Sequence, residues 1–162
     1  MGLCTSCFTS DLLSASLDST PFHSLDKVNQ KCVVLDCYDG DTCIIALHID
    51  RHKINLFKCR LIGIDTPEMK GGDKSRAMEA RDFLINSVSL QPIKSNSTRR
   101  EAQVHLSTFK RVVRVECGEW DKYGRLLIKL FVQQGVKEKC INEELIKEGH
   151  AKKYDGGTKE AW

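Results

Sequence analysis

The chain has 162 residues, a net charge of +3 at pH 7 and a composition ordinary for a globular protein. That length suits one domain with a usable core. The charge is too mild to establish a polyanion partner, so a nucleic-acid site would need a local cluster of Lys and Arg. No stretch is apolar for long enough to span a membrane, and the N-terminus lacks a secretory signal pattern, so we expect an intracellular protein.

Residues 1–27 are expected to form a flexible tail, because they are rich in Ser and Thr and show no clear hydrophobic period. Gly2 followed by Ser6 fits the N-myristoylation pattern, and Cys4 and Cys7 beside it are candidates for palmitoylation. Two acyl chains would attach the protein stably to a membrane surface, whereas one anchors weakly. Chance occurrence of so short a motif is the alternative.

The eight cysteines do not indicate a disulfide framework, since no export signal is present. Only Cys4 and Cys7 have the Cys-x-x-Cys spacing of a zinc site, and that pair has no partner pair. Five others fall in apolar, strand-like runs, namely Cys32, Cys37, Cys43, Cys59 and Cys117. We predict that these five are reduced, mostly buried thiols that pack as small apolar residues.

Three strands are predicted to follow the tail as an antiparallel meander. An apolar run at residues 32–35 leads into the Asp39-Gly40 pair, a strong hairpin signal between strand-prone segments. Residues 42–49 read as the return strand, and a second turn leads to a third strand over residues 54–64. Antiparallel neighbours of this kind bring the residues at their ends close together.

The rest of the chain is predicted to add a helix, two strands and a second helix, at residues 75–88, 109–117, 125–132 and 142–149. Ser75 and Asn142 are the expected N-caps, and the polar segment 91–102 is expected to be a loop. This order indicates an α+β, mainly β domain over residues 28–162. We expect a five-stranded OB-type barrel with two packed helices and a shortened C-terminus. The pattern alone also fits a generic α+β domain.

Two carboxylates lie at the ends of the expected strands. Asp41 follows the first hairpin turn, and Asp65 ends the third strand just before Thr66 and the conformationally rigid Pro67. Ca²⁺ and Mg²⁺ choose oxygen ligands, and a small ligand set leaves room for water and substrate. Asp41, Asp65 and the carbonyl of Thr66 would suit a calcium site. For Asp41, a simple role in the turn beside Gly40 is the alternative.

Arg60 and Arg125 are candidates for binding phosphate, because each guanidinium offers a fixed fork that meets two phosphate oxygens. Glu68 lies three residues after Asp65 and is a candidate for handling a water molecule. Surface salt bridges for the two arginines, and a plain loop carboxylate for Glu68, are the alternatives.

The chain resembles the staphylococcal nuclease-like (thermonuclease) family in three segments, at residues 39–42, 60–68 and 121–125. A weaker match covers residues 142–152, and the loop around residues 93–106 is longer than in the family. The resemblance implies an OB-type barrel that uses Ca²⁺ to hydrolyse phosphodiester bonds of DNA and RNA, preferably single-stranded, leaving 3′-phosphates. No obligate protein partner is evident from the sequence.

The resemblance also implies roles for individual residues. Asp41 and Asp65 would ligate Ca²⁺ together with the Thr66 carbonyl. Glu68 would act as general base or position the attacking water, and the scissile phosphate would be bound by Arg60 and Arg125.

Three further residues would bind substrate by the same resemblance. Lys122 and Tyr123 would meet a terminal phosphate, and Tyr154 is the nearest candidate for stacking on a base. A non-catalytic OB-type module that binds nucleic acid or a protein is the rival interpretation. Such a module has no reason to keep the whole catalytic set, which is present here as Asp41, Arg60, Asp65, Glu68 and Arg125.

Overall fold

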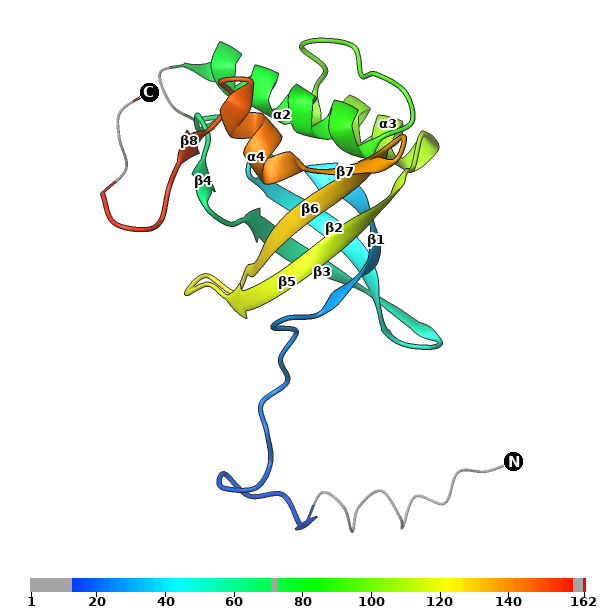
Figure 1. Ribbon diagram of the computed structural model, residues 1–162, viewed down its shortest axis with the longest axis vertical. Helices are drawn as coiled ribbons and strands as arrows, with labels where there is room; N and C mark the ends of the chain where they lie inside the picture. Colours follow the sequence, from blue (N-terminus) through cyan, green and yellow to red (C-terminus); the bar gives the residue numbers. More distant parts are fainter. Residues whose placement is uncertain (1–12, 71–72, 159–161) are drawn as a thin grey trace.

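The computed structural model describes residues 13–70, 73–158 and 162 (Figure 1). The predicted acylation sites Gly2, Cys4 and Cys7 lie outside the described residues. Residues 13–24 are exposed and run away from the barrel, whereas Leu25 is buried in the core (Figure 1). None of the described helices has both the length and the apolar character needed to cross a membrane.

Five strands close into a barrel: β1 (Asn29–Cys37), β2 (Thr42–Asp50), β3 (Lys53–Leu61), β5 (Val112–Trp120) and β6 (Leu126–Gln134). The sheet runs in the order β3-β2-β1-β5-β6 with antiparallel neighbours, and a parallel pairing of β3 with β6 closes it (Figure 1). This confirms the predicted α+β, five-stranded OB-type barrel. The short strand β7 (Lys137–Cys140) extends β6 as a hairpin that the sequence pattern did not reveal.

The barrel interior is filled by alternate residues of each strand. On β5, Val113, Val115 and Cys117 are buried, as their alternation predicts. The five cysteines of the strand-like runs are all buried and unbridged, which confirms the prediction for Cys32, Cys37, Cys43, Cys59 and Cys117.

The predicted third strand, residues 54–64, is interrupted. β3 ends at Leu61, and Gly63 takes a φ of +81°, a left-handed conformation that glycine adopts without steric cost. The chain then forms the separate strand β4 (Ile64–Asp65), which pairs with β8 (Lys152–Lys153). Asp65 therefore belongs to a small second sheet beside the barrel rather than to a barrel strand.

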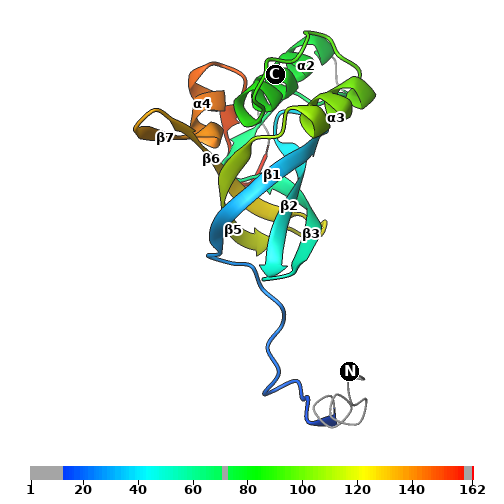
Figure 2. The ribbon, with the colours of Figure 1, turned by 90° about the vertical axis from the view of Figure 1, so that its right-hand side faces the viewer.

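Three described helices gather at one end of the barrel: α2 (Lys74–Val88), α3 (Arg99–Thr108) and α4 (Ile141–Lys147) (Figures 1 and 2). The prediction missed helix α3. Residues 91–102 were expected to be loop, and only two helices were predicted. Only Ala102 and Leu106 of α3 are buried, so its apolar period is weak. The overlooked signal is the capping box in which Thr98 and Glu101 bond each other's backbone N–H groups.

Both expected N-caps are wrong. Asp73 caps α2, where its carboxylate accepts the N–H of Arg76, so the helix begins before Ser75. At α4 the N-cap is Cys140, with no side-chain cap bond. Asn142 is instead buried inside the first turn of α4. Its side chain accepts the N–H of Leu130 and donates to the carbonyls of Ile62 and Ile128, which ties α4 to the closing strands.

Candidate active site

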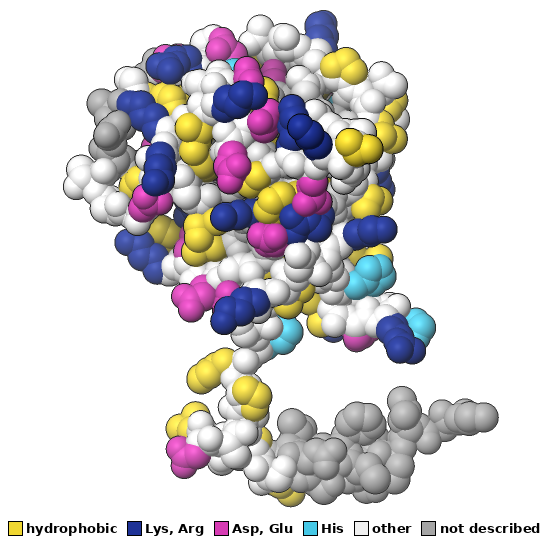
Figure 3. All heavy atoms as spheres, in the orientation of Figure 1, with side chains coloured by type: hydrophobic (Ala, Val, Ile, Leu, Met, Phe, Trp, Pro, Cys, Tyr) yellow, Lys and Arg dark blue, Asp and Glu magenta, His cyan; other side chains and the backbone are white. Residues whose placement is uncertain are grey.

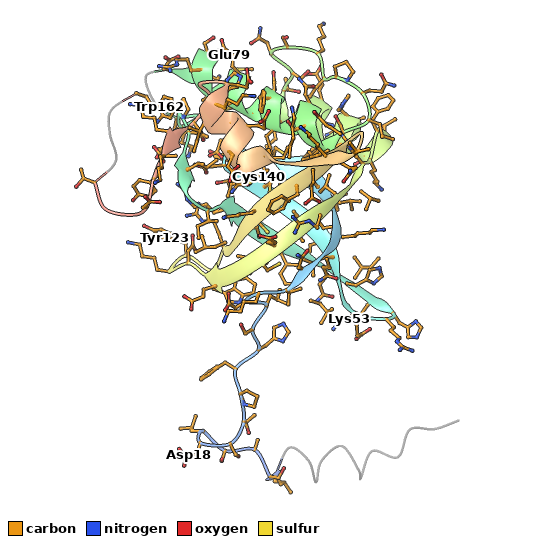
Figure 4. The ribbon with its side chains drawn as sticks, in the orientation of Figure 1. Asp18, Lys53, Glu79, Tyr123, Cys140 and Trp162 are labelled. Carbon is orange, nitrogen blue, oxygen red and sulfur yellow. The ribbon has the colours of Figure 1, made fainter. Side chains whose placement is uncertain are left out.

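A cavity of about 520 Å³ opens at the side of the barrel. Its walls come from the turn after β1, the end of β3, the segment after β4 and the β5–β6 turn, whose tip carries the labelled Tyr123 (Figure 4). The lining residues are Tyr38, Asp39, Asp41, Thr42, Arg60, Thr66, Glu68, Met69, Lys70, Asp121, Lys122, Tyr123, Arg125, Leu127 and Tyr154. Every described site residue predicted from the sequence lines this cavity, except Asp65.

The turn between β1 and β2 positions Asp41. Asp39 Oδ1 accepts the backbone N–H groups of Asp41 (3.1 Å) and Thr42 (2.8 Å), which fixes the tight Asp-Gly-Asp turn. Asp41 is only 3% exposed, and its Oδ2 accepts the N–H of Thr66 at 3.3 Å. Burial, together with the neighbouring Asp41 carboxylate, raises the pKa of Asp39 to about 6.

Arg60 connects the two predicted metal ligands. Its Nη1 lies 2.8 Å from Asp41 Oδ1, and its Nη2 lies 3.4 Å from Asp65 Oδ1 and 3.2 Å from the carbonyl of Ile64. The pairing of Arg60 with Thr42 across β3 and β2 places this guanidinium beside the turn. Arg60 therefore holds the two carboxylates in one cluster.

Asp65 lies at the edge of this cluster. It is buried and faces a neighbouring cavity of about 260 Å³ that Lys152, Lys153 and Tyr154 also line. Its Oδ2 accepts a hydrogen bond from the indole N–H of Trp162 at 3.2 Å. Figure 4 shows Trp162 near the start of α2, on the same side of the molecule as Tyr123.

The β5–β6 turn positions Arg125. Asp121 Oδ1 accepts the backbone N–H groups of Tyr123 and Arg125, both at 2.9 Å, and Asp121 Oδ2 accepts Arg125 Nε at 2.7 Å. Gly124 completes the turn with a φ of +75°. Burial acts to raise the pKa of Asp121, but the bonds from Arg125 and Tyr123 outweigh it and hold that pKa below its ordinary value.

The remaining predicted residues differ in exposure. Glu68 is exposed on the segment after β4 and Tyr123 is 72% exposed. Lys122 Nζ and the Arg125 guanidinium lie 5.2 and 5.4 Å from the centroid of the Tyr123 ring. Tyr154 is half-buried, and its hydroxyl donates to the carbonyl of Gly157.

Sequence reasoning did not assign Tyr38, Asp39 or Lys70 to the site, although all three line the cavity. Tyr38 directly precedes the Asp-Gly turn, and this position in the sequence could have identified it as a residue of the site. On the face shown in Figure 3, Lys and Arg side chains are interspersed with Asp and Glu rather than gathered in one patch. The cavity lining is mixed in the same way, with four cationic side chains, Arg60, Lys70, Lys122 and Arg125, and four carboxylates, Asp39, Asp41, Glu68 and Asp121.

No group of three or more His, Cys, Asp and Glu side chains within the described ranges is arranged to hold a metal ion. A cation near Arg60 would therefore be held by backbone carbonyl oxygens as well as carboxylates. The carboxylates of Asp41 and Asp65 and the backbone carbonyl of Thr66 are the oxygen donors that the resemblance names there.

The comparisons with known proteins agree with this geometry. The sequence profile of staphylococcal nuclease homologues, a nuclease family, matches residues 58–161. The chain is also 30% identical over 129 residues to the uncharacterized protein MJ1439 of Methanocaldococcus jannaschii. That alignment covers 75% of this chain and 58% of the relative, so the chain spans little more than half of the relative's length. Fold, cavity and sequence together show that the chain belongs to the staphylococcal nuclease homologue family.

Proposed function

We propose that this protein is a calcium-dependent nuclease that hydrolyses phosphodiester bonds of DNA and RNA and leaves 3′-phosphates. One observation carries the proposal. Arg60, Glu68 and Arg125 come from three separate segments and line the same cavity as the buried carboxylate of Asp41. A structural salt-bridge role for each residue would not require them to converge on one cavity.

The two arginines would bind the scissile phosphate. Asp121 engages Arg125 through Nε, and that bond leaves the two Nη groups for an anion. Arg60 is held by Asp41 on a rigid strand end. Two guanidinium groups fixed in advance stabilise the charge that grows on the phosphate oxygens during displacement.

Glu68 would act on the attacking water, either as general base or by positioning it. A 3′-phosphate product requires that the water oxygen bond to phosphorus while the bond from phosphorus to the 5′-oxygen breaks. The water gives up a proton, and the departing 5′-oxygen gains one. Glu68 is exposed at the cavity wall, so a carboxylate can meet water there.

The donor set fits calcium. The oxygens of Asp41, Asp65 and the Thr66 backbone are carboxylate and carbonyl oxygens, which are the ligands that hard cations choose. Within the described part of the chain, Asp41 Oδ2 accepts one long hydrogen bond, from the Thr66 N–H at 3.3 Å. Asp41, Asp65 and the Thr66 carbonyl would hold the ion. When bound, Ca²⁺ supplies positive charge next to the substrate phosphate.

Substrate outside the scissile bond would meet Lys122, Tyr123 and Tyr154. Lys122 offers a point charge for a terminal phosphate, and the exposed ring of Tyr123 lies beside it. Tyr154 lies at the wall shared by the two cavities. Aromatic rings beside cationic side chains such as Lys122 and Arg125 suit single-stranded nucleic acid, whose bases are free to stack.

The test is an assay of the purified chain on denatured DNA and on RNA, with Ca²⁺ and with a chelator. We expect cleavage only with Ca²⁺, and fragments that need a phosphatase before their 3′ ends can be extended. Arg125→Gly should lose most activity, whereas Arg51→Gly, in the exposed β2–β3 turn, should keep it. Binding without cleavage from neutral to alkaline pH would favour the non-catalytic module.

We also propose that acylation at Gly2, Cys4 and Cys7 attaches the protein to an intracellular membrane surface. Residues 13–24, which follow these sites in the sequence, leave the barrel at the end away from the helices (Figure 1). Metabolic labelling with a myristate analogue tests this. Label should appear on the wild type and be lost in Gly2→Ala, and an unlabelled wild type would refute it.

A further inference from the structure

All three tyrosines of the chain, Tyr38, Tyr123 and Tyr154, line the cavity of about 520 Å³. The family resemblance gives a substrate-binding role to the latter two only. Tyr38 is 36% exposed, so core packing does not account for its ring. An aromatic side chain at the wall of a polar cavity is placed to contact a ligand that enters it.

The Tyr38 ring has a fixed position. Its backbone N–H donates to the carbonyl of Thr42 at 2.9 Å, so Tyr38 is part of the same rigid turn as Asp41. The guanidinium carbon of Arg99, on α3, lies 5.2 Å from the centroid of the Tyr38 ring. Arg99 therefore places a positive charge against the ring and restrains it.

Arg99 is itself held by Asp36 on β1. Its Nη2 lies 2.5 Å from Asp36 Oδ2 and its Nε lies 3.4 Å from Asp36 Oδ1. Asp36 is only 5% exposed and the Arg99 side chain is 51% exposed, and their two-point ion pair by itself links α3 to the barrel. The contact between Arg99 and Tyr38 is not needed for that purpose.

We propose that Tyr38, clamped by Arg99, is a stacking platform for a nucleobase adjacent to the bound phosphate. The proposal rests on the nuclease function proposed above and adds a binding residue to it. A flat ring beside a cation stacks on any base, because every base presents a π-face. A base inside a duplex is already stacked and paired, so Tyr38 also selects unpaired nucleic acid.

The test measures binding of a fluorescein-labelled oligothymidylate of about twelve nucleotides by anisotropy, in a chelator so that no cleavage occurs. Tyr38→Ala should weaken binding by about 5- to 150-fold, the effect of losing one stacked base. Tyr38→Leu, which keeps apolar bulk without a flat ring, should be equally weak. Tyr38→Phe, which keeps the ring, should restore most of the affinity.

The matched control is Phe109→Ala. Phe109 is 37% exposed, close to the 36% of Tyr38, but lies outside the cavity, so its loss should not change the affinity. An abasic strand of the same length separates stacking from phosphate binding. Tyr38→Ala should hardly change the affinity for that strand. In cleavage assays with Ca²⁺, KM should rise more than kcat falls.

The possible outcomes distinguish a failure of the stacking platform from a failure of the nuclease function. Wild-type protein that binds and cleaves, with Tyr38→Ala and Tyr38→Leu equal to it, overturns the stacking platform and leaves the nuclease intact. An equal loss of affinity for the abasic strand overturns it too, because the contact would then be to phosphate. Wild-type protein that neither binds nor cleaves overturns both proposals.

Discussion

Arg60 Nη1 lies 2.8 Å from Asp41 Oδ1, and this ion pair joins the end of β3 to the turn between β1 and β2. The two side chains are 14% and 4% exposed, so the pair is largely shielded from water. A buried carboxylate that loses its partner is costly, whereas an exposed one is not. The same contact thus stabilises the fold and aims a guanidinium at the cavity.

Arg60→Gly should therefore lose both stability and activity. We expect the free energy of unfolding to fall by about 3 kcal/mol, since Asp41 stays buried without its cation. Activity should fall by more than about 100-fold, because a guanidinium that donates hydrogen bonds to the phosphate is lost. Urea denaturation and initial rates measure the two effects. Arg60→Lys keeps the charge but not the fork, so it should recover stability more than activity; full activity in Arg60→Lys would contradict the phosphate role.

Asp121 should contribute to the acid sensitivity of the protein. Its pKa is below its ordinary value of 3.8 in the folded state, so its contribution to stability is full above that pH and is lost as the pH falls through and below it. In Asp121→Asn this contribution is absent at every pH. The loss of stability from about pH 5 to about pH 3 should then be smaller than in the wild type. Thermal unfolding across this range tests it, and parallel profiles would refute it.

Gly40→Ala should damage the site through packing. A Cβ at Gly40 would lie 2.7 Å from Ala80 Cβ and 2.9 Å from Thr66 Cγ2, atoms of short side chains that cannot swing away. We expect a loss of about 1–3 kcal/mol in unfolding free energy and reduced cleavage, because the turn carrying Asp41 must shift. Gly118→Ala is the matched control, since its nearest atom would be Leu127 O at 3.4 Å. Equal effects of the two substitutions would contradict this account.

Trp162 should report on the calcium site by fluorescence. Its indole N–H bonds Asp65, and the Arg76 guanidinium and Lys152 Nζ each lie 5.1 Å from its ring centroid. Ca²⁺ binding at Asp65 would change these surroundings. We expect Trp120→Phe, which leaves Trp162 as the single tryptophan, to respond to Ca²⁺. Trp162→Phe should not respond, because Trp120 packs on Phe57 and does not line the cavity. The reverse pattern would place the ion elsewhere.

The barrel thiols should be unreactive in the folded protein. Burial raises the pKa of Cys32 to about 12 and that of Cys117 to about 11, so little thiolate forms near neutral pH. In a Cys4→Ser/Cys7→Ser variant, a thiol reagent at pH 8 should label the half-buried Cys140 first. The other thiols should react only after denaturant is added. Rapid labelling of all of them without denaturant would indicate an open barrel.

Much of the fold follows from local pattern. The alternation of Val113, Val115 and Cys117 defines β5, and the Asp39-Gly40 pair defines the first hairpin. Period-two alternation carries this information because one face of each strand must be buried. The helix α3 escaped notice because it buries only Ala102 and Leu106, so its apolar stripe is too thin to show a helical period.

The sequence by itself determined which residues are chemically able to act: two arginines, the carboxylates of Asp41, Asp65 and Glu68, and a stiff turn at Pro67. Only the tertiary structure decided how these side chains are arranged relative to one another. Gly63 turns Asp65 out of the barrel sheet, Asn142 ties α4 to the closing strands, and Tyr38 and Arg99 meet across 61 residues of chain. Such contacts depend on barrel closure and helix docking, which bring together residues whose separation along the chain gives no local signal.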